Sequence, residues 1–259
     1  MTGRLAALRR QPNAVLLAAQ LLGVLLYPFF GDSRAGTTAV STFGLLVLAL
    51  AVWSVASTAW TVWVSIVLGV PSGLLAVAHV FTDTGWVVGA GAAFDSAFYF
   101  YAAGSLIVYM LADFTITRDE LFAVGATFTL LAWAFAHLFV LTQVIWPGSF
   151  TAAGPGATRT WMELLFLSFT TLSSTGLSDV VPVLPHARSV LMIEQLVGLA
   201  YVAMVVSWMV GLTVARANVR GRRPTAGTGS ADGRGSADVR ADDVADGVGD
   251  GERAGADEH

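Results

Sequence analysis

Residues 160–185 combine a short apolar segment with a polar, proline-containing continuation. The apolar part, Trp161–Phe169, is too short to cross a bilayer as a helix, which takes about 20 residues. The continuation carries hydroxyl side chains, a glycine and an acid. Backbone that enters a membrane and turns back is tolerated only where protein buries it or where it lines a water-filled cavity. The stretch therefore predicts a re-entrant segment beside an aqueous path.

The same stretch predicts where this short helix begins and ends. Thr160 and Glu163 have the spacing of a capping box, which satisfies backbone donors at a helix start. We expect the helix to end within 171–174, where its dipole places partial negative charge that favours a cation. The polar residues assigned to this helix are Thr160, Glu163, Thr170 and Thr171.

The segment TTLSSTGLSDVVP resembles the pore helix, filter and post-filter segment of tetrameric potassium-type channels, whose filter reads T-V-G-Y-G-D. Ser174 stands at the filter threonine, Gly176 at the first glycine and Asp179 at the acid. Leu177 replaces the aromatic residue, and Ser178 replaces the second glycine. The resemblance implies an outer mouth at Asp179 and a selectivity filter formed by Ser174, Thr175, Gly176, Leu177 and Ser178.

The two departures bear on ion selectivity. In the family, filter carbonyls replace the hydration shell of the ion, and glycine adopts backbone conformations that other residues resist. We therefore expect Ser178 to be strained in a left-handed conformation and the outer half of the filter to take another shape. Two simpler readings stay open: the Ser/Thr cluster ends a buried helix, and Asp179 caps a loop.

Composition places the chain in a membrane and offers no catalytic constellation. It is 55% hydrophobic and 12% charged, far more apolar than an average soluble domain. The absence of cysteine excludes disulfides and thiolate metal sites, and the scattered histidines lack ligand spacing. We predict that the protein is no enzyme and has no cofactor, metal site or nucleic-acid partner.

Apolar runs predict six membrane-spanning helices with a glycine-rich connection at 84–91. The spans lie at about 14–30, 37–53, 59–80, 92–111, 121–146 and 187–214. Arginines precede the first span and follow the last, so the positive-inside rule places both termini in the cytoplasm. The first run could also be a signal peptide, but its length and its bulky end favour a retained anchor.

These elements predict an all-α, multi-pass protein of the cell membrane with one re-entrant pore helix and filter loop. Its parts are a cytoplasmic N-terminus (1–13), a four-helix membrane region (14–113), a cytoplasmic loop (114–120), a pore module (121–216) and a disordered acidic cytoplasmic tail (217–259). The tail lacks the apolar residues that a folded core needs. The fourth span carries no arginine, so the four-helix region is not a standard voltage sensor.

Two residues of the last span are candidates for gating. Glu194 is an ionisable group inside a span, which is costly and by default functional; alternatively, its carboxyl hydrogen-bonds and holds the pore helix. The resemblance implies that Gly198 is a hinge, and the alternative is a glycine that eases helix packing. Asp95 is expected to reach the membrane interface, and His137 to be a buried histidine with a partner.

One re-entrant loop per chain cannot surround an ion, so we expect four chains around one axis. The resemblance implies passive conduction of monovalent cations in a homotetramer within the lipid bilayer. Potassium is the first candidate, and a non-selective or sodium-permeable pore is the second. A secondary transporter built on broken helices and a non-conducting relative of the pore module remain alternatives.

Overall fold

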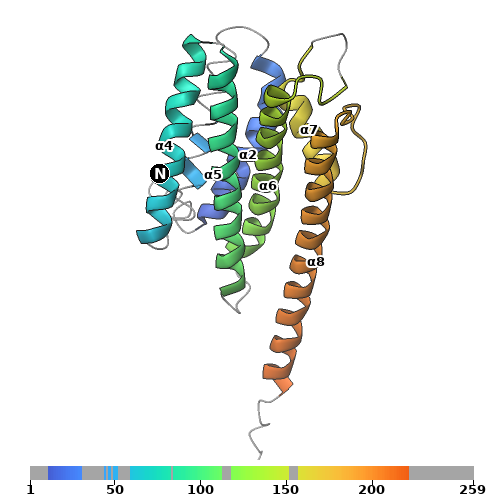
Figure 1. Ribbon diagram of the computed structural model, residues 1–259. Helices are drawn as coiled ribbons and strands as arrows, with labels where there is room; N and C mark the ends of the chain where they lie inside the picture. Colours follow the sequence, from blue (N-terminus) through green and yellow to red (C-terminus); the bar gives the residue numbers. More distant parts are fainter. Residues whose placement is uncertain are drawn as a thin grey trace, which may run out of the picture. The chain divides into compact units, whose positions relative to one another are not determined.

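The structure, a computed structural model, describes residues 11–30, 44, 46–47, 49–51, 59–82, 84–112, 118–151 and 157–221. Its helices are α2 (Pro12–Phe30), α4 (Ala59–Phe81), α5 (Gly85–Ala112), α6 (Arg118–Ile145), α7 (Trp161–Leu172) and α8 (Pro185–Gly221) (Figure 1). Apart from one isolated bridge, Phe150 to Pro182, the described residues contain no β-structure. The predicted all-α class is confirmed for this part of the chain.

Four described helices are long and apolar enough to cross a membrane. They are Pro12–Phe29, Gly85–Ala112, Asp119–Ile145 and Pro185–Gly211, and α4 adds a shorter apolar segment, Trp63–Ala78. Of the predicted span at 37–53, only 44, 46–47 and 49–51 are described, and these residues are helical. The chain is thus a helical membrane protein, and the count of six spans stays a prediction.

The start of α5 corrects the predicted glycine-rich connection at 84–91. The helix begins at Gly85. The carbonyl of the residue before it, Thr84, accepts the backbone N–H of Val87 at 3.0 Å. A Cβ on Gly89 would lie 3.1 Å from Cγ1 of Val144 in α6. Glycine permits helices to approach closely, so Gly89 serves helix packing and not a loop.

The start of α6 corrects the predicted cytoplasmic loop at 114–120, because Arg118–Glu120 are helical. Asp119 and Glu120 occupy the first helical turn, where the dipole favours negative charge. The Asp119 carboxylate also accepts the Asn13 backbone N–H at 3.3 Å and its Nδ2 at 2.7 Å. This contact joins the beginnings of α2 and α6.

The last helix is longer than its predicted span at 187–214. α8 reaches Gly221, so residues 217–221, predicted to begin the tail, are helical. The rest of the predicted tail, 222–259, and the predicted N-terminal segment up to residue 10 lie outside the described residues.

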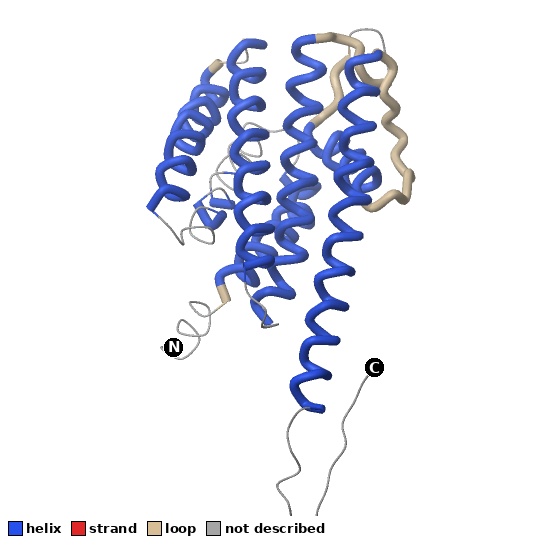
Figure 2. The backbone as a smooth tube through the Cα atoms, turned by 60° about the horizontal axis from the view of Figure 1, so that its bottom comes forward, coloured by secondary structure: helices blue, strands red, loops and turns tan. Residues whose placement is uncertain are grey.

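α6 occupies the centre of the described helices and contacts α2, α5 and α7. Its inward side chains form much of the buried core, including Leu130, Ala134, Phe135 and Phe139. The Tyr201 hydroxyl of α8 donates to the Val124 carbonyl of α6 at 2.7 Å. Figures 1 and 2 show α7 beside the first half of α8, while the second half of α8 extends beyond it.

A chain of side-chain contacts runs from α4 to the first residue of α7. The Ser72 hydroxyl of α4 donates to the Asp95 carboxylate of α5, which lies 3.7 Å from Nδ1 of His137 in α6. The ring centroids of His137 and Trp161 are 5.7 Å apart. Trp133 packs edge-on against the same Trp161 ring, with 5.2 Å between the ring centroids. His137 thus has contact partners, as predicted, but it is half-buried and not fully buried, whereas Asp95 bonds another helix.

Candidate functional site

The start of α7 is a capping box, as the sequence predicts. Glu163 N donates to Thr160 Oγ1 at 3.3 Å, and Thr160 N donates to Glu163 Oε2 at 2.7 Å. Burial opposes ionisation of Glu163, but hydrogen bonds from Thr160 and Arg159 outweigh it and lower the pKa of this carboxyl. Its negative charge lies in the first turn, where the helix dipole stabilises it.

The end of α7 is a Schellman motif, with the helix stopping inside the predicted range 171–174. Thr175 N donates to the Thr170 carbonyl at 2.9 Å, and Ser174 N donates to the Thr171 carbonyl at 3.0 Å. Gly176 N also reaches the Thr170 carbonyl, at 3.1 Å. Carbonyls that a helix end leaves without partners are therefore bonded by the first residues of the following loop.

Backbone strain in this loop lies at Ser174 and not at Ser178, which corrects the sequence-based expectation. Ser174 has φ +59° and is the one non-glycine residue with positive φ among the described residues; Gly176 has φ +66°. The left-handed position of a Schellman motif usually holds glycine. Ser178 instead accepts the Val180 N–H on its hydroxyl at 3.1 Å, so this side chain bonds the backbone that follows.

The five residues assigned to the filter lie together between α7 and α8. Ser174 to Leu177 are exposed in the single chain, Ser178 is half-buried and Asp179 is exposed. The Leu177 side chain is 77% exposed. Figure 2 shows this loop as the long tan segment that leads from the end of α7 back to the start of α8.

Glu194 and Gly198 of α8 both face α7. The fully buried Glu194 accepts a hydrogen bond from the Ser168 hydroxyl. A Cβ on Gly198 would lie against the Leu172 carbonyl oxygen and 2.8 Å from the Leu172 Cα. One helical turn separates the two contacts on each helix, so α7 and α8 run in the same direction here. This geometry agrees with the alternative roles, in which Glu194 hydrogen-bonds the pore helix and Gly198 eases helix packing. The gating roles of both residues stay predictions.

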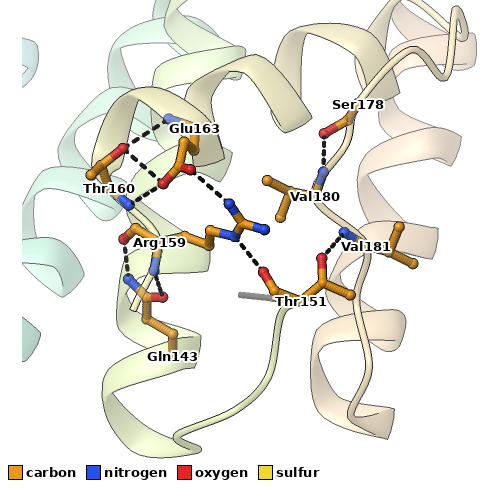
Figure 3. Close-up of polar contacts among 8 residues, drawn as sticks. All are labelled: Gln143, Thr151, Arg159, Thr160, Glu163, Ser178, Val180 and Val181. Atoms are coloured by element: carbon orange, nitrogen blue, oxygen red, sulfur yellow. Dashed lines mark hydrogen bonds and ion pairs between the residues drawn. The ribbon is translucent and has the colours of Figure 1, made fainter. Parts of the chain in front are cut away.

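A polar cluster, which we name the outer clasp, joins the start of α7 to the segment that follows the filter-like loop (Figure 3). It consists of Gln143, Thr151, Arg159, Glu163 and Val181. Arg159 Nη1 donates to Glu163 Oε1 at 2.7 Å, and its Nε donates to the Thr151 carbonyl. Its backbone exchanges two bonds with the Gln143 side chain, at 2.8 and 3.0 Å.

The clasp continues from Thr151 to the chain beyond the filter-like loop. Thr151 N donates to the Val181 carbonyl at 2.9 Å, and Val181 N donates to Thr151 Oγ1 at 2.9 Å. Val183 N adds a bond to the Ser149 carbonyl at 2.8 Å. Sequence reasoning missed these partners because they are distant along the chain. The one local signal is the spacing of Arg159 and Glu163, four residues apart in the range of helical ion pairs.

Residues 96–214 match a family model whose description is "Ion channel". The match begins within α5 and covers α6, α7, the filter-like loop and most of α8. This segment is therefore similar to the ion-channel family of two-helix pore modules, which supports the ion-channel part of the sequence-based interpretation. Neither the curated proteins nor the solved structures contain a match to this chain.

We predict that Gly198→Ala destabilises the protein, because the new methyl group meets the Leu172 backbone, which cannot rotate away. Overpacking of this kind costs about 1–3 kcal/mol. Thermal unfolding of the purified protein measures the loss. Gly211→Ala is the matched control on the same helix, since no atom lies within 4 Å of a Cβ built there. A Gly198→Ala protein of unchanged stability but altered channel opening would instead favour the hinge.

We also predict that Ser174→Gly stabilises the protein by about 1 kcal/mol, because glycine adopts positive φ without a steric cost. Ser174→Val is expected to destabilise it. Ser173, with φ −79°, provides the control: Ser173→Gly gains nothing and loses a hydroxyl that bonds the Phe169 carbonyl at 2.7 Å. Thermal unfolding compares the three variants, and equal effects of the two glycine substitutions would contradict the assignment of strain to Ser174.

Proposed function

We propose that this chain is one subunit of a channel that conducts monovalent cations passively, with potassium as the first candidate ion. The observation that carries the proposal is the half-length helix α7 followed by the loop S-S-T-G-L-S-D, inside the segment that matches the ion-channel family. A capped helix that stops part-way through a membrane and returns as polar backbone needs an aqueous path. The family match likewise supports a channel in place of an enzyme.

The filter of this channel consists of Ser174, Thr175, Gly176, Leu177 and Ser178. Ser174 to Leu177 are exposed in the single chain and Ser178 is half-buried, so these residues can contact other subunits. Four copies placed around an axis would bring four such loops together, so that their carbonyls could replace the hydration shell of an ion. A homotetramer is therefore part of the proposal.

Asp179 follows the filter and is exposed. In a tetramer it would form a ring of four carboxylates at the outer mouth, which attracts cations. Glu194 and Gly198 support α7 from behind through Ser168 and Leu172. On the proposed topology both termini lie in the cytoplasm and the outer clasp lies outside, in the cell membrane of the host.

Weak selectivity, with sodium also permeant, is the second candidate, and Leu177 and Ser178 favour it. Leu177 is largely exposed and lacks the ring that an aromatic residue would pack behind the filter. The Ser178 hydroxyl accepts the Val180 N–H, a bond that glycine at this position could not form. The outer half of the loop therefore differs from that of the family it resembles. We propose a cation pore with a weaker preference for potassium over sodium than the family it resembles.

The experiment is recording from the purified protein in planar bilayers, together with the mass of the detergent-solubilised particle. We expect unitary cation currents from a particle of four chains. A secondary transporter or a non-conducting relative would give no unitary currents, and a conducting monomer would overturn the assembly.

Leu177→Tyr combined with Ser178→Gly is predicted to strengthen the preference for potassium, because it restores the aromatic ring and the conformational freedom of glycine. Bi-ionic reversal potentials measure this preference. Leu177→Ile combined with Ser178→Ala is the control, since it restores neither property. Strong potassium preference in the unmodified protein, left unchanged by the first pair of substitutions, would contradict the proposal.

A further inference from the structure

We propose that Arg159 is a positioning residue for the filter: through the outer clasp it holds the segment after the filter at a fixed place relative to the start of the pore helix. This inference rests on the proposed channel function, and it concerns a residue that supports the proposed filter. It assigns a role to a residue that lies outside the filter and is not among the site residues predicted from the sequence.

The Arg159 side chain connects two segments that the chain does not place side by side. Its Nη1 bonds the Glu163 carboxylate in the first turn of α7, and its Nε bonds the carbonyl of Thr151 in the preceding loop. Only 15% of the side chain is exposed. A guanidinium offers several donors in a rigid plane, whereas a lysine ammonium is a flexible point charge. The arrangement therefore depends on arginine and not on positive charge alone.

The backbone of Arg159 anchors the same point to α6. Gln143 Nε2 donates to the Arg159 carbonyl, and Arg159 N donates to Gln143 Oε1. Phe150, next to Thr151, is buried and packs against Phe139 of α6 at 5.4 Å. The clasp is thus bonded to and packed against α6, the most buried of the long apolar helices in the described structure. These contacts fix the position of the clasp relative to α6.

The outer end of the filter loop is attached to this clasp. The inner end is bonded to the Thr170 carbonyl through Thr175 and Gly176. Two residues after Asp179, Val181 exchanges two bonds with Thr151, which Arg159 holds. Because Leu177 is exposed and buries little against its own chain, the outer half of the loop depends on its far end for a defined position. Arg159 supplies that position through Thr151.

The test compares Arg159→Gln with Arg159→Lys in the full chain. Hydrogen–deuterium exchange of the Val181 and Val183 amides reports on the clasp directly, and the bi-ionic reversal potential reports on the filter. We expect Arg159→Gln to accelerate exchange about tenfold or more, because a charge-assisted bond is lost, and to shift the reversal potential towards zero. Arg159→Lys retains the charge but loses the rigid fork, so it is expected to show part of both effects.

Two further variants separate the clasp from general effects. Thr213→Val removes an exposed hydroxyl that bonds the Met209 carbonyl within α8 at 2.8 Å and leaves every bond of the clasp in place, so both readouts should stay near those of the unmodified protein. Thr151→Val removes only the acceptor of the Val181 N–H and is expected to reproduce the Arg159→Gln phenotype. If Arg159→Gln fails to fold, Arg159→Lys keeps the role of Arg159 testable through the same two readouts.

The outcomes distinguish this inference from the proposed function. Unchanged exchange at Val181 and Val183 in Arg159→Gln overturns the role of Arg159 in the clasp, whether or not the channel conducts. Faster exchange with unaltered reversal potential and conductance overturns the positioning role. If the unmodified protein carries no current, the proposed function fails, and the exchange data still decide whether Arg159 holds the post-filter segment.

Discussion

A helix that ends in the interior of a protein must find partners for its terminal carbonyls there, because an unpaired buried carbonyl costs free energy. In α7 the solution is local: the backbone N–H groups of Ser174, Thr175 and Gly176 turn back onto Thr170 and Thr171. The turn requires one left-handed residue, and Ser174 takes that conformation. The direction of the filter-like loop follows from this bonding pattern, and so does its exposure on the outside of the single chain.

Three kinds of contact hold α7, one each at its start, its middle and its end. Its start is fixed by charge-assisted hydrogen bonds from Arg159 and by the capping box. Its middle is tied to α8 by the bond from Ser168 to Glu194, and its end rests on the backbone surface that Gly198 exposes. The aromatic contacts of Trp161 with Trp133 and His137 add the connection to α6. A short helix of this kind gains its position from tertiary contacts, since isolated helices of this length are marginal.

The sequence allowed prediction of those features that depend on neighbours within about one helical turn. The capping box, the stop of α7 and the loop beyond it are local, and the structure contains all three. Prediction failed at the start of α5, where the glycines indicated a loop but are helical, and Gly89 packs against Val144. It failed again at Ser178, because alignment by residue type could not show that the left-handed position falls at Ser174. The outer clasp joins residues up to 30 positions apart, and no periodicity or motif connects them.

The missing side chain at Gly198 restricts how α8 can move. Successive residues of a helix are rotated by about 100° around its axis, so a rotation by one position would turn Val197 or Leu199 towards the Leu172 backbone. Neither side chain fits where a single carbon already meets the carbonyl oxygen. The contact at Gly198 therefore fixes the register of the first half of α8 against α7. A displacement of α8 that keeps this contact must either carry α7 and the filter-like loop with it or be confined to the part of the helix beyond Gly198.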